Sequence, residues 1–290
     1  LQDANTFPRH HQPISRAPRV KLHPLLTEYR PQISEALARE AELTRPLLRK
    51  ASAEADAVLD QLVEYSVRGK MIRGALVLLG GGLLGRLPDG VLLRAAAALE
   101  LTQSFLLIHD DIMDRDDLRR GAPAMHAVYR EASGLTGAVA DRLGNAMAIC
   151  AGDIAAMLAL SAANAAAHEA GFPGVAARFC TEVASVGLAQ MNDVRFGLTD
   201  ADPPEADIER VYRFKTGRYT FSLPLLFGAA LAGADDAVVE ALASAGEEFG
   251  IAFQLRDDEI GSFGRTQETG KPAGADLREN KKTILRRMIL

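Results

Sequence analysis

The stretch LELTQSFLLIHDDIMDRDDLRRGAPAM, residues 99–125, is the most chemically loaded part of the chain and sets the expected fold. A mostly apolar segment ends in a cluster of acids, of which the first three are Asp110, Asp111 and Asp114. On an α-helix, Asp110 and Asp114 lie on one face and Asp111 lies about 100° around the axis. Because three carboxylates this close repel one another, the segment predicts a helix end that a cation neutralises.

The ligands that this cluster offers are all carboxylate oxygens. Hard oxygen ligands suit Mg²⁺, which keeps several waters and is completed by substrate phosphates. A solvated, charged helix end is the alternative for one such pattern taken alone. A second cluster, FQLRDDEIG at residues 253–261, repeats the design with Asp257 and Asp258 after an apolar helical segment. Two such helices facing each other predict several Mg²⁺ ions between them and a diphosphate as the substrate.

With these motifs the sequence resembles the trans-isoprenyl diphosphate synthase (polyprenyl synthetase) family, most of all its geranylgeranyl and farnesyl diphosphate synthases. Five ordered elements between residues 65 and 283 are far more specific than any one of them. The resemblance implies an all-α isoprenoid synthase fold, a helical bundle around a deep central cavity. The matching elements are GKMIRG (69–74), HDDIMD (109–114) with RRG (119–121), KTG (215–217), FQLRDD (253–258) and GKPAGADLRENKKT (270–283).

Composition agrees with a large helical protein. Hydrophobic residues make up 48% of the 290 residues and aromatic residues only 6%, which favours packed helices over a sheet. The formal net charge of −5 argues against general nucleic-acid affinity. Cys150 and Cys180 lie in Ala-rich helical patterns and are expected to be reduced core residues of a cytoplasmic protein. No uninterrupted apolar run reaches the ~20 residues that span a bilayer, so no membrane span is expected.

One domain, residues 25–290, is expected to follow an irregular arm, residues 1–24, that contains four prolines and no apolar signal core. Because the family normally continues with further helices, C-terminal helices are expected to be missing after residue 290. A loop is expected after Gly121, with a connection over residues 126–140. Apolar periodicity predicts helices over residues 25–48, 51–67, 145–167, 179–196, 208–214 and 237–254.

Four residues outside the acid clusters are candidates for binding isopentenyl diphosphate. Lys70 and Arg73 lie at an expected helix start, whose free N–H groups also favour an anion; a solvated turn is the alternative. The resemblance implies that both hold the diphosphate and that Arg120 adds a further contact. Gln103 stands where the family has a His. Gln still donates a hydrogen bond but cannot become cationic, so weaker binding of isopentenyl diphosphate or an altered acceptor is expected.

The resemblance also implies how an allylic diphosphate ionises. Mg²⁺ ions and three cations would stabilise the charge that grows on pyrophosphate; the cations are Arg119, Lys215 and Lys271. Lys271 belongs to a Gly-rich flap, residues 264–280, that is expected to close over the diphosphate. The expected Mg²⁺ ligands are Asp110, Asp111, Asp114, Asp257 and Asp258.

Polar residues near the expected carbocation have smaller roles. Thr216 and Gln254 are candidates for oriented oxygens in an otherwise dry pocket. Gln190 and Asp193, three apart on one helix face, resemble a Gln-x-x-Asp element of the family, with ordinary surface polarity as the alternative. His109 is expected to be a structural hydrogen-bonding residue.

Product length is expected to depend on the depth of the apolar cavity below Asp110. Phe105 and Leu106 lie five and four residues before Asp110, about 6–7.5 Å deeper along the helix. The resemblance to the family implies that these two positions form the floor of the cavity. A single aromatic residue there, with no residue inserted between Asp111 and Asp114, resembles geranylgeranyl (C20) synthases, with farnesyl (C15) synthases second.

The predicted function is Mg²⁺-dependent, head-to-tail condensation of isopentenyl diphosphate with an allylic diphosphate by a homodimer. A class I terpene cyclase would also ionise a diphosphate but would lack the second diphosphate site. Lys70, Arg73 and Arg120 argue against the cyclase, whereas Gln103 and Gly261, which replaces a third Asp, keep it open. A non-catalytic partner subunit of another synthase is the third alternative, and the presence of both acid clusters disfavours it.

Overall fold

A computed structural model of the protein describes residues 24–200, 202–263 and 281–289. Apart from Pro24, the predicted arm lies outside these residues, and so does the predicted flap with Lys271. The regular structure of the described residues is helical, as the sequence predicts, except for one two-stranded hairpin that the sequence does not predict.

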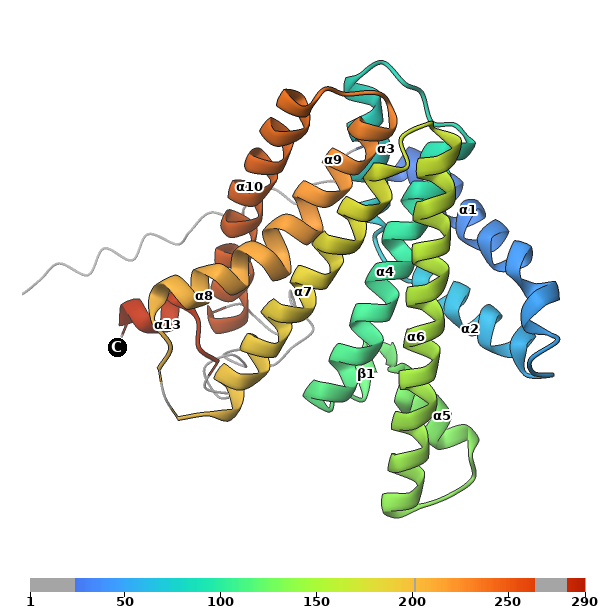
Figure 1. The fold of residues 1–290 in the computed structure, drawn as a ribbon. Helices are drawn as coiled ribbons and strands as arrows, with labels where there is room; N and C mark the ends of the chain where they lie inside the picture. Colours follow the sequence, from blue (N-terminus) through green and yellow to red (C-terminus); the bar gives the residue numbers. More distant parts are fainter. Residues whose placement is uncertain (1–23, 201, 264–280, 290) are drawn as a thin grey trace, which may run out of the picture.

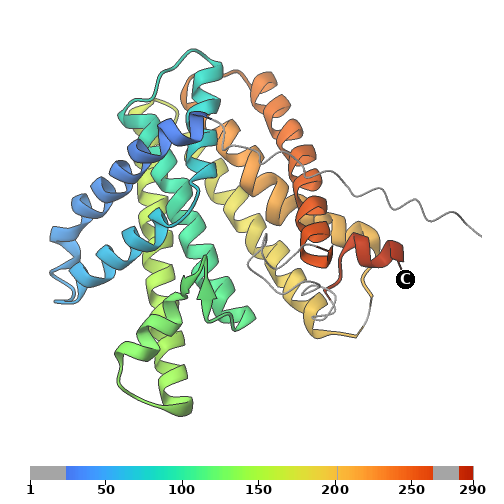
Figure 2. The ribbon, with the colours of Figure 1, turned by 180° about the vertical axis from the view of Figure 1, so that it is seen from behind.

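The helices form a bundle in which α4 and α6 lie side by side at the centre, with α1 and α2 on one side and the later helices on the other (Figures 1 and 2). In the first half they are α1 (Pro24–Leu48), α2 (Ala55–Val67), α3 (Ile72–Leu83), α4 (Gly90–Asp114), α5 (Met125–Ala132) and α6 (Gly137–Glu169). In the second half they are α7 (Gly174–Leu198), α8 (Glu205–Val211), the π-helix η1 (Tyr212–Ser222), α9 (Leu223–Leu231), α10 (Asp236–Phe263) and α13 (Ile284–Ile289).

Helix α4 is the central element and carries the first acid cluster at its C-terminal end. The Asp89 carboxylate caps its start by accepting a hydrogen bond from the backbone N–H of Leu92 at 2.9 Å. Residues 95–99 are wholly buried, and four of the five are alanines, which lets neighbouring helices approach closely. A capped, fully packed helix holds the acids at its end in a defined position.

The predicted connection over residues 126–140 is wrong in part, because it contains α5 and the first turn of α6. Cys150 and Cys180 are free thiols, but the prediction that they lie in the core is also wrong, since both are exposed. Cys150 directly precedes the buried Ala151 on α6, and Cys180 directly follows the buried Phe179 on α7. One residue turns the side chain by about 100°, which takes each thiol off the buried face.

Two described helices, α4 and α6, are long and apolar enough to cross a membrane by length and composition alone. Uninterrupted apolar runs in the sequence do not reveal either helix, because Glu100 interrupts the apolar run of α4 and Asp153 that of α6. In α4, 67% of the apolar window is buried inside the bundle, as expected for a core helix, against 44% in α6. The apolar window of α6 is therefore less covered by neighbouring helices than that of α4.

The π-helix η1 replaces the end of the helix predicted over 208–214. Its hydrogen bonds run from residue i to i+5, a rare geometry that is frequently found at functional sites. It lies against α10 at a crossing of two glycines, where a Cβ on Gly250 would come within 2.0 Å of Gly217 Cα. Pro224 is the second residue of α9, in the first turn, where its missing N–H is tolerated.

Gly250→Ala is expected to lower the free energy of unfolding by about 1–3 kcal/mol, because the added methyl must push η1 and α10 apart. Urea unfolding followed by circular dichroism measures the change. Gly197→Ala in α7 is the matched control, because a Cβ there meets nothing within 4 Å. A Gly250 variant as stable as the Gly197 variant would show that the crossing is loose.

Candidate functional site

An apolar cavity of about 630 Å³ opens between α4, α7, η1 and α10. Its lining also includes Ile72 and Arg73 on α3 and brings together residues that are up to 185 positions apart in the sequence, from Ile72 to Asp257. Among the predicted site residues, the lining contains Arg73, Gln103, Phe105, Leu106, Asp110, Lys215, Thr216, Gln254 and Asp257.

The first two acids of the cluster on α4 point to different environments. Asp110 lines the cavity and accepts a hydrogen bond from Gln190 Nε2 on α7 at 2.9 Å. Asp111 is fully buried and accepts hydrogen bonds from the hydroxyl of Tyr65 at 3.1 Å and from Nε of Arg119 at 2.5 Å. Asp110 is thus available to a ligand in the cavity, whereas Asp111 ties the end of α4 to its neighbours.

The segment after α4 forms a tight hairpin instead of the predicted loop. Its strands are β1 (Leu118–Arg119) and β2 (Ala122–Pro123), joined by a two-residue turn. Arg120 and Gly121 in the turn have φ angles of 55° and 75°, the conformation of a type I′ hairpin. The sequence signal for this turn is Asn-Gly, Asp-Gly or Gly-Gly, and the Arg-Gly pair here supplies only the glycine, so the RRG segment does not predict the hairpin by itself.

The hairpin sends its two arginines to different places. Arg119 pairs with Asp111, and its Nη2 atom also lies 3.6 Å from Asp110 Oδ2. Arg120 packs over Gly69, because a Cβ on that glycine would lie 2.7 Å from Arg120 Nη1. One cation therefore serves the acid cluster, and the other joins the GKMIRG segment that contains Lys70.

The second acid cluster repeats the arrangement of the first. Asp257 lines the cavity, while Asp258 is buried and accepts hydrogen bonds from the hydroxyl of Tyr212 and from Gln254 Nε2, the latter at 2.9 Å. Tyr212 precedes Asp258 by 46 residues, the same separation as between Tyr65 and Asp111. Burial raises the pKa of both tyrosines, so both hydroxyls stay protonated and donate hydrogen bonds to their aspartates.

Lys215 on η1 stands between the acids of α4 and α7. Its Nζ atom lies 2.5 Å from Asp193 Oδ2 and 3.7 Å from Asp110 Oδ1. Burial opposes the charge, but the carboxylates of Asp193 and Asp110 outweigh it and raise the pKa of Lys215. The next residue, Thr216, donates a hydrogen bond to Gln254 Oε1 at 2.8 Å, which links η1 to α10.

The wall around Arg73 holds several polar atoms without partners. Arg73 donates a hydrogen bond from Nη2 to Thr220 Oγ1 at 2.6 Å, and its guanidinium lies 4.4 Å from the ring centre of Tyr219. Within the described residues, Arg73 Nε, Gln103 Oε1 and the Tyr219 hydroxyl are buried without a hydrogen-bond partner. Unpaired buried polar atoms cost free energy, so this wall favours a polar ligand or water. Lys70, three residues before Arg73, is exposed.

His109 has a structural environment, as predicted. Its Nε2 atom lies 3.2 Å from the carbonyl oxygen of Ile149, and its ring packs on α6 where a Cβ on Gly152 would come within 2.4 Å. The ring also stacks edge-on against Phe105, with centroids 5.1 Å apart. The contact helps to hold α4 against α6 directly before the acids.

The carboxylates fit Mg²⁺ only as an open site. Asp114 is exposed at the end of α4, but desolvation of its carboxylate and, after it, the neighbouring charge of Asp110 raise its pKa to about 6, which marks a position where a cation would be stabilised. Within residues 24–200, 202–263 and 281–289, no three Asp, Glu, His or Cys side chains already converge as a metal cage. Oxygen ligands in an incomplete set match Mg²⁺, which takes one or two carboxylates together with substrate phosphates and waters.

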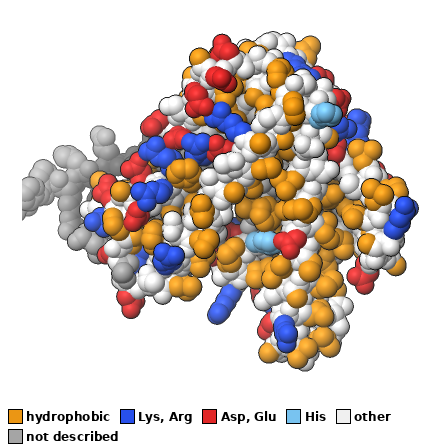
Figure 3. All heavy atoms as spheres, in the orientation of Figure 1, with side chains coloured by type: hydrophobic (Ala, Val, Ile, Leu, Met, Phe, Trp, Pro, Cys, Tyr) orange, Lys and Arg blue, Asp and Glu red, His pale blue; other side chains and the backbone are white. Residues whose placement is uncertain are grey.

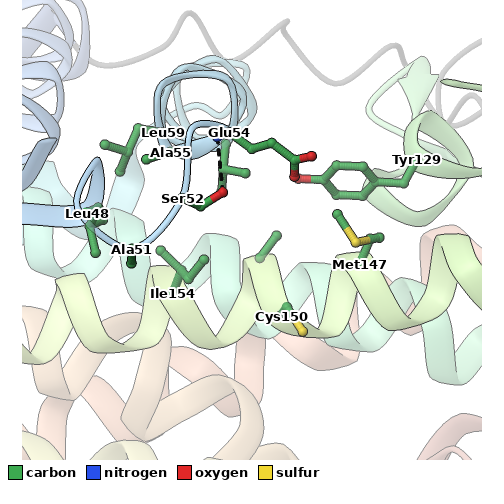
Figure 4. Close-up of a pocket in the computed structure, with 12 residues that line it drawn as sticks. Leu48, Ala51, Ser52, Glu54, Ala55, Leu59, Tyr129, Met147, Cys150 and Ile154 are labelled. Carbon is green, nitrogen blue, oxygen red and sulfur yellow. Dashed lines mark hydrogen bonds between the residues drawn. The ribbon is translucent and has the colours of Figure 1, made fainter. Parts of the chain in front are cut away.

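A smaller pocket of about 220 Å³ lies between α2, α5 and α6 and has a different character (Figure 4). In the close-up, the Tyr129 ring lies above Met147, and the backbone N–H of Glu54 donates to Ser52 Oγ at 3.1 Å. None of the described residues that line it is Lys, Arg or His, so the lining does not offer the cationic groups that border the larger cavity.

Comparisons with known proteins agree with this geometry. The family model described as Polyprenyl synthetase matches residues 56–289. The geranylfarnesyl diphosphate synthase of Aeropyrum pernix is 36% identical over 224 residues, which cover 75% of this chain and 65% of that protein. The geranylgeranyl diphosphate synthase of Saccharolobus solfataricus is 34% identical and covers 76% and 62%, and the (2E,6E)-farnesyl diphosphate synthase of Mycobacterium tuberculosis is 32% identical and covers 84% and 66%. The chain thus spans 62–66% of the length of these relatives.

Solved structures give the same relationship. The geranylgeranyl pyrophosphate synthase from Corynebacterium glutamicum, complexed with isoprenyl diphosphate and magnesium, has a TM-score of 0.79 at 31% identity, covering 90% of this chain and 75% of that one. The polyprenyl synthetase from Streptomyces coelicolor has a TM-score of 0.61 at 29% identity, covering 73% and 58%. The all-α isoprenoid synthase fold predicted from the sequence is confirmed.

Proposed function

Because the chain belongs to the polyprenyl synthetase family, we propose that it is a trans-prenyltransferase that condenses isopentenyl diphosphate head-to-tail with an allylic diphosphate. The expected product is a short-chain prenyl diphosphate, C20 or otherwise C15. The observation that carries the proposal is the rim of the large cavity, where Asp110 and Asp257 come from different helices with Lys215 beside Asp110. This arrangement offers a charged mouth for a diphosphate and an apolar interior for a hydrocarbon chain.

The carboxylates proposed to hold Mg²⁺ are Asp110, Asp114 and Asp257. Asp111 and Asp258 are also ligands expected from the sequence, but their burial against tyrosines favours a role in positioning the rim. Bound Mg²⁺ would supply Lewis-acid stabilisation of the charge on the leaving diphosphate.

The chain's own cations complete the proposed diphosphate sites. Lys215 and Arg119 lie beside the first acid cluster and would stabilise the leaving pyrophosphate, with Lys271 as a further predicted contact. Arg73 and Gln103, whose buried polar atoms lack partners in the described part of the chain, would receive isopentenyl diphosphate. Lys70 and Arg120 belong to the same proposed site.

Two groups would act on the allylic cation without reacting covalently with it. Thr216 and Gln254 are hydrogen-bonded to each other at the cavity wall, so their oxygens are held in fixed orientations. Oriented dipoles in a water-poor cavity stabilise a carbocation without reorganising at the moment of reaction. The apolar residues below them would keep water from the cation.

Activity at limiting Mg²⁺ is expected to fall about tenfold for each pH unit below the Asp114 pKa of about 6. Above this pH the side chain is a carboxylate and can bind a cation; below it the bound proton must first leave. Raising the Mg²⁺ concentration tenfold is expected to move the midpoint down by about one pH unit. The measurement is kcat/KM against pH at several Mg²⁺ concentrations, with Asp114→Asn as the control. A midpoint of the pH profile that does not change with Mg²⁺ concentration would contradict the assignment of Asp114 as a Mg²⁺ ligand.

A homodimer in the cytoplasm is also proposed. The outer face of α6 is apolar and open in the single chain: Val139 is 65% exposed, Met157 61% and Ile149 44%. Figure 3 shows hydrophobic side chains gathered along this helix. An apolar strip of this kind on a long helix favours burial against a second subunit.

The proposed function is tested by incubating the purified protein with Mg²⁺, isopentenyl diphosphate and, in turn, dimethylallyl, geranyl or farnesyl diphosphate. Mass spectrometry is expected to find a C20 or C15 diphosphate that disappears when the metal is chelated. A hydrocarbon or alcohol formed from an allylic diphosphate alone, with isopentenyl diphosphate left intact, would support a terpene cyclase. Activity only after adding another synthase would support a non-catalytic subunit.

A further inference from the structure

We propose that Gly187 on α7 is a determinant of product chain length, in addition to the predicted floor residues Phe105 and Leu106 on α4. The inference rests on the proposed function and concerns the same cavity. It states that the missing side chain at position 187 leaves room for the prenyl chain below the rim.

Gly187 is a glycine that helix packing does not explain. A glycine inside a helix is destabilising relative to alanine, so its presence in the middle of α7 calls for a compensating use. At helix crossings that use is close contact: a Cβ on Gly80, Gly228 or Gly250 would meet backbone atoms within 2.2 Å. A Cβ on Gly187 meets nothing within 4 Å.

The other open helix glycines differ in position. Within the described residues they lie at the first residue of a helix or one residue before its end, where a glycine costs little. Only Gly187 combines open space with a mid-helix position in this part of the chain. The open glycines at helix ends are Gly82, Gly90, Gly137, Gly174 and Gly197.

The space beside Gly187 belongs to the large cavity. Gly187, Gln190, Met191 and Val194 all line it, and their spacing of i, i+3, i+4 and i+7 makes them one face of α7. The face that α7 turns to the cavity therefore includes the bare backbone at residue 187.

The depth of Gly187 follows from the contact between α7 and α4. Gln190 bonds to Asp110 and so marks the rim, and both helices run towards the rim at their C-terminal ends (Figure 1). Gly187 precedes Gln190 by three residues, which places it about 4.5 Å deeper. Phe105 and Leu106 precede Asp110 by five and four residues, about 6–7.5 Å deeper. The open stretch of wall thus lies just above the predicted floor.

At the depth that a growing prenyl chain must pass, the cavity is therefore lined by the side chains of Phe105 and Leu106 on α4 and by a residue without a side chain, Gly187, on α7. A leucine side chain is close in size to one five-carbon isoprene unit. A Leu at position 187 would occupy the space of about one unit from the opposite side to Phe105, without disturbing the diphosphate sites at the rim.

The test compares the products of wild-type protein, Gly187→Leu, Gly187→Ala, Phe105→Ala and the Gly187→Leu/Phe105→Ala double variant with Mg²⁺, isopentenyl diphosphate and dimethylallyl diphosphate. Gly187→Leu is expected to shorten the main product by one isoprene unit, and Phe105→Ala to lengthen it. The double variant is expected to move back towards the wild-type length. Gly187→Ala, which adds only a methyl group, is expected to keep the wild-type length and to raise the melting temperature.

The outcomes separate the two proposals. If the wild-type protein elongates the substrate and a folded Gly187→Leu protein gives the same products, the role of Gly187 is overturned and the proposed function stands. Failure of the wild-type protein to consume isopentenyl diphosphate overturns the proposed function and this inference together. Thermal unfolding shows whether the Leu variant is folded, and Gly187→Met, with an unbranched side chain, must also shorten the product.

Discussion

Asp110→Asn is expected to lower kcat/KM for the allylic diphosphate about a thousandfold, a loss of about 4 kcal/mol of transition-state stabilisation. The substitution keeps the shape of the side chain and removes the charge that faces the cavity. Asn can still accept the hydrogen bond from Gln190, so the end of α4 is expected to stay in place. Steady-state kinetics at saturating isopentenyl diphosphate measure the loss.

The matched control is Asp116→Asn, which removes the same charge two residues after Asp114. Asp116 lies 3.7 Å from Arg119 but does not line the cavity. Its variant is expected to stay within about threefold of wild type, because Asp116 is half-exposed and its long contact with Arg119 contributes little. Equal losses in the two variants would mean that the overall negative charge of the segment, and not Asp110 itself, supports the reaction.

The local part of the site could be predicted from the sequence. Asp110 and Asp114 are one helical turn apart, and an apolar run precedes them, so helix periodicity alone places them on one face. The cavity lining includes Phe105 and Leu106 for the same reason. Each of these inferences needs only the geometry of a single helix.

The contacts that orient the acids could not be predicted in this way. Tyr65 and Tyr212 each lie 46 residues from the aspartate that they hold, and no periodicity connects positions so far apart. The same is true of Thr220, which binds Arg73 from 147 residues away. Such pairs depend on how the helices pack, which a single sequence does not encode locally.

Two errors have a similar cause. Helix periodicity distinguishes helix from strand, but it does not show that the turns of η1 widen to a π-helix where Gly217 meets α10. Nor does it show which side of α6 remains open, and so the sequence predicts Cys150 in the core although it is exposed. Both features depend on the neighbours of a helix and not on the helix alone.

Lys215→Gln is expected to lower kcat by about 10²–10³-fold, the usual loss when one preorganised donor to a developing negative charge is removed. Lys215 is held by Asp193 and lies 3.7 Å from Asp110 Oδ1, so its ammonium is fixed at the rim before any substrate arrives. Gln can replace one hydrogen bond but not the charge. Rapid-quench or steady-state kinetics with the allylic diphosphate measure kcat, and Lys50→Gln on the exposed surface is the matched control.

The division of this loss between kcat and the Mg²⁺ requirement distinguishes two roles for Lys215. If the lysine only neutralises Asp110 and Asp193, its removal leaves two carboxylates that more Mg²⁺ can satisfy, and activity should recover as Mg²⁺ is raised. If it contacts the leaving diphosphate, kcat stays low at every Mg²⁺ concentration, because the charge that develops in the transition state has lost its partner. The position of Nζ between two acids and beside the cavity supports the second outcome, and full recovery in Mg²⁺ would assign Lys215 to charge balance alone.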